Sequence, residues 1–170
     1  LFHPVYDVFG VKVARENGLS FLNLKDGKYL LFFGLVRDYK GLDLALEAMS
    51  HPEIKELNIK LIVAGEFYGN KKKYTDLIDE LQLENIILFP EFIPSEDVTN
   101  YFAVADAVLQ PYLTATQSGI TQVAYHFETP MILTAVGGLP EIVTHNSEGL
   151  ICKVNSSEIA KSILNFYSIV

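Results

Sequence analysis

The chain has few of the residues and motifs that would assign it to several common classes of protein. Its 170 residues include one cysteine and no tryptophan. The single cysteine, Cys152, excludes an internal disulfide and a cysteine-rich metal site. No apolar run approaches the ~20 residues that a bilayer span requires, and no signal peptide is visible. The chain starts at Leu1 without a methionine, which predicts a fragment of a longer protein.

Positive charge is scarce. Thirteen lysines and arginines face 21 aspartates and glutamates, which gives a formal net charge of −8. This balance argues against a nucleic-acid partner. There is no GxGxxG fingerprint, GxxxxGK[ST] loop, HExxH motif or histidine cluster with ligand spacing, so nicotinamide, flavin, P-loop nucleotide and metal sites are poorly supported.

What the chain does contain is a regular alternation of strand-like and helix-like segments. Several strand candidates are short, continuous apolar runs, as expected for strands buried on both faces of a parallel sheet. The alternation predicts an α/β fold, a Rossmann-like doubly wound parallel sheet of about six strands. The predicted strands are Tyr29–Phe33, Lys60–Ala64, Ile86–Phe89, Ala107–Leu109, Met131–Thr134 and Gly149–Cys152, and the predicted helices lie near 42–50, 71–82, 96–104, 119–127, 139–144 and 156–167.

The first part of the chain differs from the rest. Residues 1–26 contain a short helical pattern but no clear strand. We expect them to be a connecting segment that leads into one Rossmann-like domain over residues 27–170.

The loop after the first predicted strand is the most informative. The apolar run Tyr29 to Phe33 ends in Gly34, two cations, Arg37 and Lys40, follow, and a helical pattern begins at Gly41. Open α/β sheets bind ligands at the carboxyl ends of their strands. Helix N-termini and nearby Arg and Lys favour anions there. The loop is either a site for a phosphorylated ligand or a surface loop with solvated cations.

The next two loops fall at equivalent positions. Gly65 follows the second strand and allows a tight turn close to a ligand, although an ordinary connecting turn fits as well. After the third strand, Phe92 and Ile93 could lie against a base whose edge is bound by main-chain groups. The alternative is a structural turn capped by Ser95, with Glu96 in the first helical turn.

The loop after the fourth strand carries Thr116, Gln117, Ser118 and Gly119. Its hydroxyls and the exposed amides of a helix start could cradle a diphosphate. They could equally form caps and local turns.

The loop after the fifth strand contains Gly137, Gly138 and Glu141. Glu141 either holds a sugar hydroxyl or only complements the dipole of the following helix.

Together, and in this order, these loops resemble the C-terminal, donor-binding half of GT-B glycosyltransferases of family 4, the group 1 glycosyl transferases. The family's glycine followed by Lys-Gly corresponds to Gly34, Lys40 and Gly41, with Arg37 between them. The other matching segments are Val63-Ala64-Gly65, Phe92-Ile93-Pro94, Tyr101 to Pro111 with Ala105-Asp106, Thr129-Pro130-Met131-Ile132, Gly137-Gly138-Leu139-Pro140-Glu141 and, before the domain, His3 to Asp7 with Phe9.

The chain departs from the family at one place. Two glutamates usually precede the segment that matches Thr129-Pro130. Here the corresponding positions are Ala115 and Val123, or Thr116 and Ala124 when the match is shifted by one residue. Either the chain belongs to a subgroup that uses amides and hydroxyls, or its donor binding is altered.

The resemblance implies an enzyme, a hexosyl- or related transferase, that transfers sugar from a nucleotide-diphosphate sugar with retention. Residues 1–26 would be a linker segment from a missing N-terminal domain, and residues 27–170 the nucleotide-sugar-binding, Rossmann-like domain. It implies that Arg37, Lys40 and Glu141 are catalytic and that the glycines, Phe92, Ile93 and the 116–119 loop bind the donor. No metal or cofactor is expected, because cations and helix amides can stabilise the leaving diphosphate.

The resemblance also implies partners and a location. The acceptor would be held by the chain's own N-terminal domain, absent here, so the isolated fragment is expected to be inactive. A cytoplasmic enzyme of polysaccharide biosynthesis is expected, peripheral to the inner face of the membrane if its acceptor is a lipid. The alternative is a non-catalytic nucleotide- or sugar-binding module with the same fold.

Overall fold

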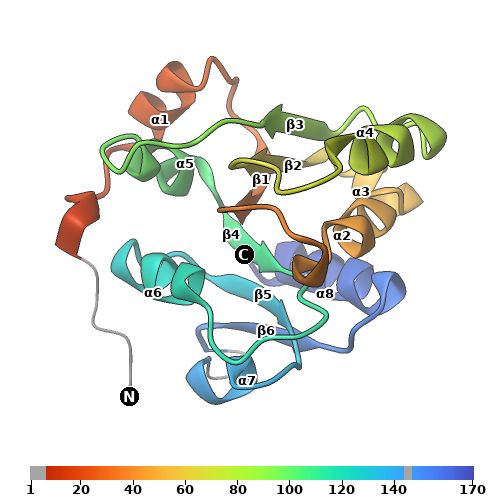
Figure 1. The fold of residues 1–170 in the computed structure, drawn as a ribbon. Helices are drawn as coiled ribbons and strands as arrows, with labels where there is room; N and C mark the ends of the chain where they lie inside the picture. Colours follow the sequence, from red (N-terminus) through yellow and green to blue (C-terminus); the bar gives the residue numbers. More distant parts are fainter. Residues whose placement is uncertain (1–6, 144–146) are drawn as a thin grey trace.

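The structure is a computed structural model of the chain, and it describes residues 7–143 and 147–170. Six strands of these residues form one sheet in the order β3-β2-β1-β4-β5-β6, and every neighbouring pair is parallel (Figure 1). The predicted doubly wound parallel sheet is confirmed, and each predicted strand is present to within one residue at either end. The strands are β1 (Lys28–Phe33), β2 (Ile59–Ala64), β3 (Ile86–Phe89), β4 (Ala107–Gln110), β5 (Met131–Thr134) and β6 (Gly149–Cys152).

Helices connect the strands and cover both faces of the sheet (Figure 1). One hydrophobic core lies between the sheet and helices α2, α3, α4 and α8, and a second lies on the opposite face beneath α1, α5, α6 and α7. The helices are α1 (Arg15–Phe21), α2 (Leu42–Met49), α3 (Pro52–Glu56), α4 (Lys71–Glu80), α5 (Val98–Val104), α6 (Gly119–His126), α7 (Leu139–Ile142) and α8 (Ser156–Ile169), with 3-10 turns η1 (Asp7–Phe9) and η2 (Asp38–Lys40).

Local sequence explains where several helices begin. The side chain of Asn155 accepts a hydrogen bond from the amide of Glu158 and so caps α8. Pro52 stands in the first turn of α3, a short helix that the apolar pattern did not predict. The predicted cap at Ser95 is wrong, because α5 begins only at Val98 and the preceding residues form a turn.

The predicted helix over 139–144 runs from Leu139 to Ile142, and its last predicted residue lies outside the described part of the chain. The segment His3 to Tyr6 of the family resemblance also lies outside it.

Helix α1 belongs to the same folded unit as the sheet. A Cβ atom added at Gly18 would lie 2.7 Å from the carbonyl oxygen of Asn100 in α5, so glycine permits close packing of the two helices. The guanidinium of Arg15 donates to the carbonyl oxygen of Val104 at 2.6 Å and pairs with Asp106 at 3.1 Å. Part of the segment expected to be a linker therefore packs on the domain. That a further domain precedes residue 27 stays a prediction.

Candidate donor-binding site

The order of the strands defines one crevice. The chain runs from β1 outward to β3 and then crosses back to β4 on the other side of β1, so β1 and β4 flank the topological switch point where open α/β sheets bind ligands. The loops that follow these two strands are in contact. The amide of Leu113 donates to the carbonyl oxygen of Tyr39 at 2.8 Å. Gly41, at a φ of +69°, leaves room for the carbonyl oxygen of Pro111, which an added Cβ would approach to 1.9 Å.

Lys40 lies at the floor of this crevice. A Cβ atom added at Gly34 would lie 3.3 Å from Lys40 Nζ and 3.1 Å from Ile120 in the first turn of α6. Lys40 is 8% exposed, and its ammonium lies 5.8 Å from the centre of the Tyr112 ring. Burial, with a smaller contribution from the charge of Arg37, lowers the pKa of Lys40 to about 8. No described carboxylate forms an ion pair with it.

The start of α6 lies beside this lysine. Ser118 precedes the helix but its side chain does not cap it, and its hydroxyl is instead 3.3 Å from the hydroxyl of Tyr112. The first amides of a helix have no partner within the helix. At Gly119 an added Cβ would meet nothing within 4 Å, so the first residue of the helix borders open space. A buried ammonium and an uncapped helix start thus occur together, an arrangement suited to an anion.

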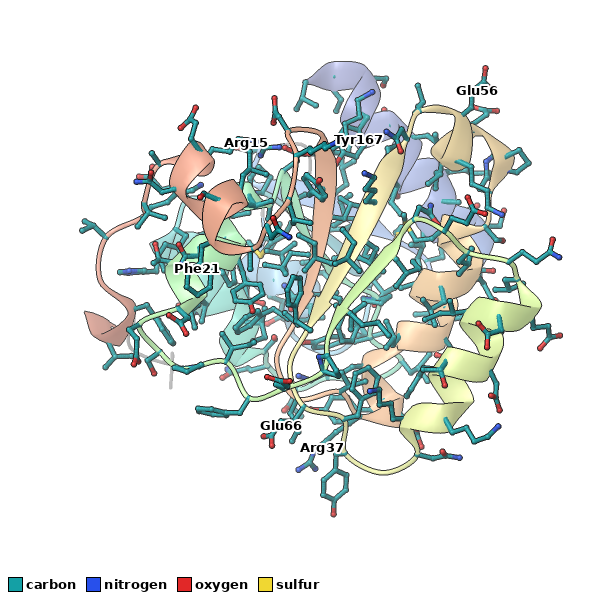
Figure 2. All side chains as sticks on the ribbon, turned by 90° about the horizontal axis from the view of Figure 1, so that it is seen from above. Arg15, Phe21, Arg37, Glu56, Glu66 and Tyr167 are labelled. Atoms are coloured by element: carbon teal, nitrogen blue, oxygen red, sulfur yellow. The ribbon has the colours of Figure 1, made fainter. Side chains whose placement is uncertain are left out.

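Arg37 lies on the outer side of the same loop. Its guanidinium carbon is 4.6 Å from the centre of the Tyr68 ring, which extends from the loop after β2. Figure 2 shows Arg37 and Glu66 at the carboxyl end of the sheet, opposite Arg15 and Tyr167. The two predicted cations therefore take different positions, with Lys40 inside the crevice and Arg37 at its edge.

A cavity of about 240 Å³ opens between the loops after β1, β2 and β3. Gly65, at a φ of +139°, permits this close approach, because an added Cβ would lie 2.2 Å from the carbonyl oxygen of Gly34. Phe92 is 69% exposed, so its ring is available at the mouth. Four residues predicted from three separate loops thus line one cavity. Its lining residues are Phe33, Gly34, Leu35, Gly65, Glu66, Phe92 and Ile93.

A second cavity of about 240 Å³ lies between the loop before α6 and the start of α7. Gly137 has a φ of +50°, and an added Cβ there would overlap the carbonyl oxygen of Ala115 at 1.4 Å. The amide of Gly138 donates to the carbonyl oxygen of Thr116 at 3.3 Å. Both glycines therefore hold the two loops together. The lining residues are Thr116, Gln117, Ser118, Gln122, Gly138, Glu141 and Ile142.

The structure accounts for the positions where the family carries paired glutamates. Val123 and Ala124 are buried in the core beneath α6, and Ala115 packs against the same core. Thr116, the remaining candidate position, lines the cavity and offers a hydroxyl in place of a carboxylate. Of the residues that the structure describes, Glu141 alone brings a carboxylate to this cavity, beside the amides of Gln117 and Gln122.

A further cavity, of about 280 Å³, lies at the amino end of β5, away from the switch point. Among the described residues, Glu128 and Glu148 line it and no lysine or arginine does. It is therefore unsuited to a phosphorylated ligand.

Comparison with known proteins identifies the family. The family model for glycosyl transferases group 1 matches residues 16–168. The chain belongs to the group 1 glycosyl transferases. An uncharacterized glycosyltransferase of Methanocaldococcus jannaschii is 31% identical over 148 residues, which cover 84% of this chain and 37% of that protein. The chain thus spans little more than a third of the length of such relatives.

Solved structures of glycosyltransferases share the fold. The C-terminal domain of the group 1 glycosyl transferase LpcC from Francisella tularensis superposes with a TM-score of 0.80 at 20% identity, covering 95% of this chain and 86% of that one. Anabaena HepE, solved in complex with UDP, also superposes with a TM-score of 0.80, at 19% identity, and the match covers 96% of this chain and 46% of that one. This group 1 glycosyl transferase chain therefore has the fold of a C-terminal GT-B domain.

Sequence reasoning missed the aromatic partners of the cations. Tyr68 and Tyr112 both stand in loops that we singled out, but neither was assigned a role. Each contacts a cation from a different loop, Arg37 and Lys40 respectively. No spacing within one segment reveals such contacts, because they depend on which loops the sheet order brings together.

Proposed function

We propose that this domain binds the nucleotide diphosphate of a sugar donor, and that the protein containing it transfers the sugar to an acceptor held by an N-terminal domain. The observation that carries the proposal is the crevice at the switch point. There a buried lysine, which pairs with no carboxylate in the described part of the chain, lies beside an uncapped helix start, between two cavities. Relatives support it, since Anabaena HepE was solved with UDP and with UDP-glucose.

Each part of a nucleotide-diphosphate sugar has a counterpart in the site. We assign the base to the cavity of Gly65, Phe92 and Ile93, whose lining is largely apolar. The diphosphate lies near Gly34, Lys40 and the start of α6, with Arg37 at its outer side. The sugar occupies the second cavity, where hydroxyls, two amides and Glu141 can bind its hydroxyl groups.

The chemistry requires stabilisation of negative charge on the leaving diphosphate. Lys40, Arg37 and the helix amides can supply it without a metal ion, because preorganised donors act strongly where water is excluded. We therefore propose metal-independent transfer, with retention at the anomeric carbon as the family resemblance implies. Activity that is unchanged by EDTA is the expected result for the full-length protein.

The proposed location follows from the same assignment. Within the described ranges, no helix combines the length and apolar character needed to cross a membrane. We propose a cytoplasmic enzyme whose acceptor, if a membrane lipid, is met through the N-terminal domain. A role in polysaccharide synthesis would parallel WaaG, a structural neighbour involved in lipopolysaccharide biosynthesis.

Titration calorimetry of the 170-residue chain with UDP, GDP and ADP tests the binding site. Arg37→Ala and Lys40→Ala should each weaken the tightest of these ligands by about 1.5–3 kcal/mol, the range for hydrogen bonds to charged groups. Lys72→Ala is the matched control, because Lys72 is an exposed cation already paired with Asp76. Equal affinity in all four proteins would remove the diphosphate from this crevice.

A second experiment separates the enzyme from a binding module with the same fold. The full-length protein is incubated with nucleotide-sugar donors, and release of the nucleoside diphosphate is measured. Release that requires both an acceptor and Lys40 supports transfer. Tight binding with no release in the presence of a range of acceptors would favour the module.

A further inference from the structure

The two arginines of the chain are held in opposite ways. The guanidinium of Arg15 forms four hydrogen bonds, to the carboxylates of Asp26 and Asp106 and to the carbonyl oxygens of Val104 and Gly27. These contacts use its donors and neutralise its charge. Arg15 is therefore a structural residue at the amino end of the sheet.

Arg37 has no such partners. Within the described residues its guanidinium forms no ion pair and no hydrogen bond. Its guanidinium carbon lies over the Tyr68 ring, 4.6 Å from the ring centre. An aromatic face attracts a cation through its quadrupole and takes none of its N–H donors. A guanidinium held in this way keeps its full charge and five donors for an incoming anion.

The backbone fixes the loop that carries this ring. The amide of Tyr68 donates to the carbonyl oxygen of Val36 at 2.9 Å. The amide of Val36 donates to the carbonyl oxygen of Glu66 at 2.8 Å. Val36 and Phe67 form an isolated parallel bridge beyond the end of the sheet. The residue before Arg37 is thus tied to the residues around Tyr68, so the cation and the ring are carried by two loops locked together.

The Tyr68 side chain lies at the surface and is not part of either hydrophobic core. Its side chain is 68% exposed, and within the described residues its hydroxyl forms no hydrogen bond. The guanidinium is the partner that explains its position. Lys40 repeats the arrangement inside the crevice, where the Tyr112 ring lies near its ammonium.

We propose that Tyr68 is a positioning residue for Arg37. Its ring orients the guanidinium at the edge of the crevice without neutralising it, so that Arg37 meets the diphosphate of the donor already ordered. This inference rests on the proposed function, because it takes the diphosphate as the ligand of Arg37. Preorganisation improves affinity by reducing the entropy lost on binding.

Calorimetry with UDP, GDP or ADP, whichever the wild-type chain binds most tightly, tests the proposal. Tyr68→Leu should weaken binding about two- to fivefold, the range expected for an exposed cation–π contact. Tyr68→Phe keeps the face of the ring and should bind as the wild type does. Leu57→Ala removes an exposed apolar side chain between α3 and β2, at the opposite end of the sheet, and serves as the control for the loss of exposed apolar surface.

A double-mutant cycle with Arg37→Ala supplies the readout that a merely structural role would not produce. In the Arg37→Ala background, Tyr68→Leu should cause no further loss of affinity. An equal loss in both backgrounds, or wild-type affinity in Tyr68→Leu, would overturn the role of Tyr68. If Arg37→Ala itself binds as well as the wild type, the proposed placement of the diphosphate fails as well, which distinguishes the two failures.

Discussion

Replacing Lys40 by methionine should stabilise the folded domain while it weakens the binding of nucleoside diphosphates. Lys40 is 8% exposed and has no described carboxylate partner. A buried cation without a counter-ion raises the free energy of the folded state. Methionine is unbranched and adaptable, so it can fill the same space without the charge.

The lowered pKa gives the magnitude. A fall from the ordinary value of 10.5 to about 8 corresponds to about 3 kcal/mol at about 1.4 kcal/mol per pH unit. This is an upper estimate for the gain in the free energy of unfolding at pH 7. For a domain of this size it raises Tm by about 6–12 °C, since 1 kcal/mol moves Tm by about 2–4 °C.

The gain should depend on pH in a defined direction. Between about pH 8 and 10.5, Lys40 is protonated in the unfolded chain and largely neutral in the folded chain. The free energy of unfolding of the wild type therefore rises with pH in this range. The methionine variant lacks that contribution. Its advantage should therefore be largest below pH 8 and should shrink as the pH approaches 10.5.

Urea denaturation of both proteins at pH 7 and pH 10 measures these differences. Lys153→Met, the same substitution at an exposed lysine, is the control and should change the free energy of unfolding little at either pH. A Lys40→Met variant that is less stable than the wild type at pH 7 would refute the argument. So would an advantage that is the same at both pH values.

Three further outcomes follow from the same site. In the wild type, the affinity for diphosphate should fall above about pH 8 by up to about tenfold per pH unit, because the anion binds the protonated form of Lys40; a flat profile in calorimetry from pH 7 to 9.5 would contradict this. In the full-length protein, Glu141→Gln should reduce sugar transfer strongly if Glu141 holds the sugar, whereas Gln117→Ala should do so if neutral groups hold it; if neither changes turnover, the sugar is not in this cavity. Gly137→Ala should destabilise the domain by at least about 1–2 kcal/mol, the cost of a left-handed backbone, since its Cβ also meets the carbonyl oxygen of Ala115; unchanged Tm would show that the two loops separate easily.

The sheet could be predicted from the sequence because its strands are short apolar runs between amphipathic helices. Burial on both faces leaves β1 and β2 almost free of polar residues, which makes their limits visible. The short helix α3 was not predicted because five residues are too few to show a repeating apolar pattern. Ser95 was predicted to cap α5, but a turn follows it and the helix begins only at Val98, with Asp97 at the N-cap position.

The candidate site was predictable loop by loop but not as an arrangement. Gly34, Gly65, Phe92 and Ile93 were each expected from their place after a strand, and they line one cavity. The different surroundings of Arg37 and Lys40 could not be deduced, because the sequence places them in one loop. They diverge because Lys40 is the buried last residue of a 3-10 turn, whereas Arg37 precedes that turn and is exposed.

The position of the crevice has a consequence for how the chain unfolds. Strands β1 to β3 form one half of the sheet and β4 to β6 the other, and the halves meet at the register of Leu30 with Ala107 and Leu31 with Val108. A ligand bound at the switch point contacts loops from both halves, so any opening that parts β1 from β4 must first release it. Diphosphate at a hundredfold excess over its Kd should therefore slow hydrogen exchange on both sides of this seam, by up to about 2.7 kcal/mol of opening free energy.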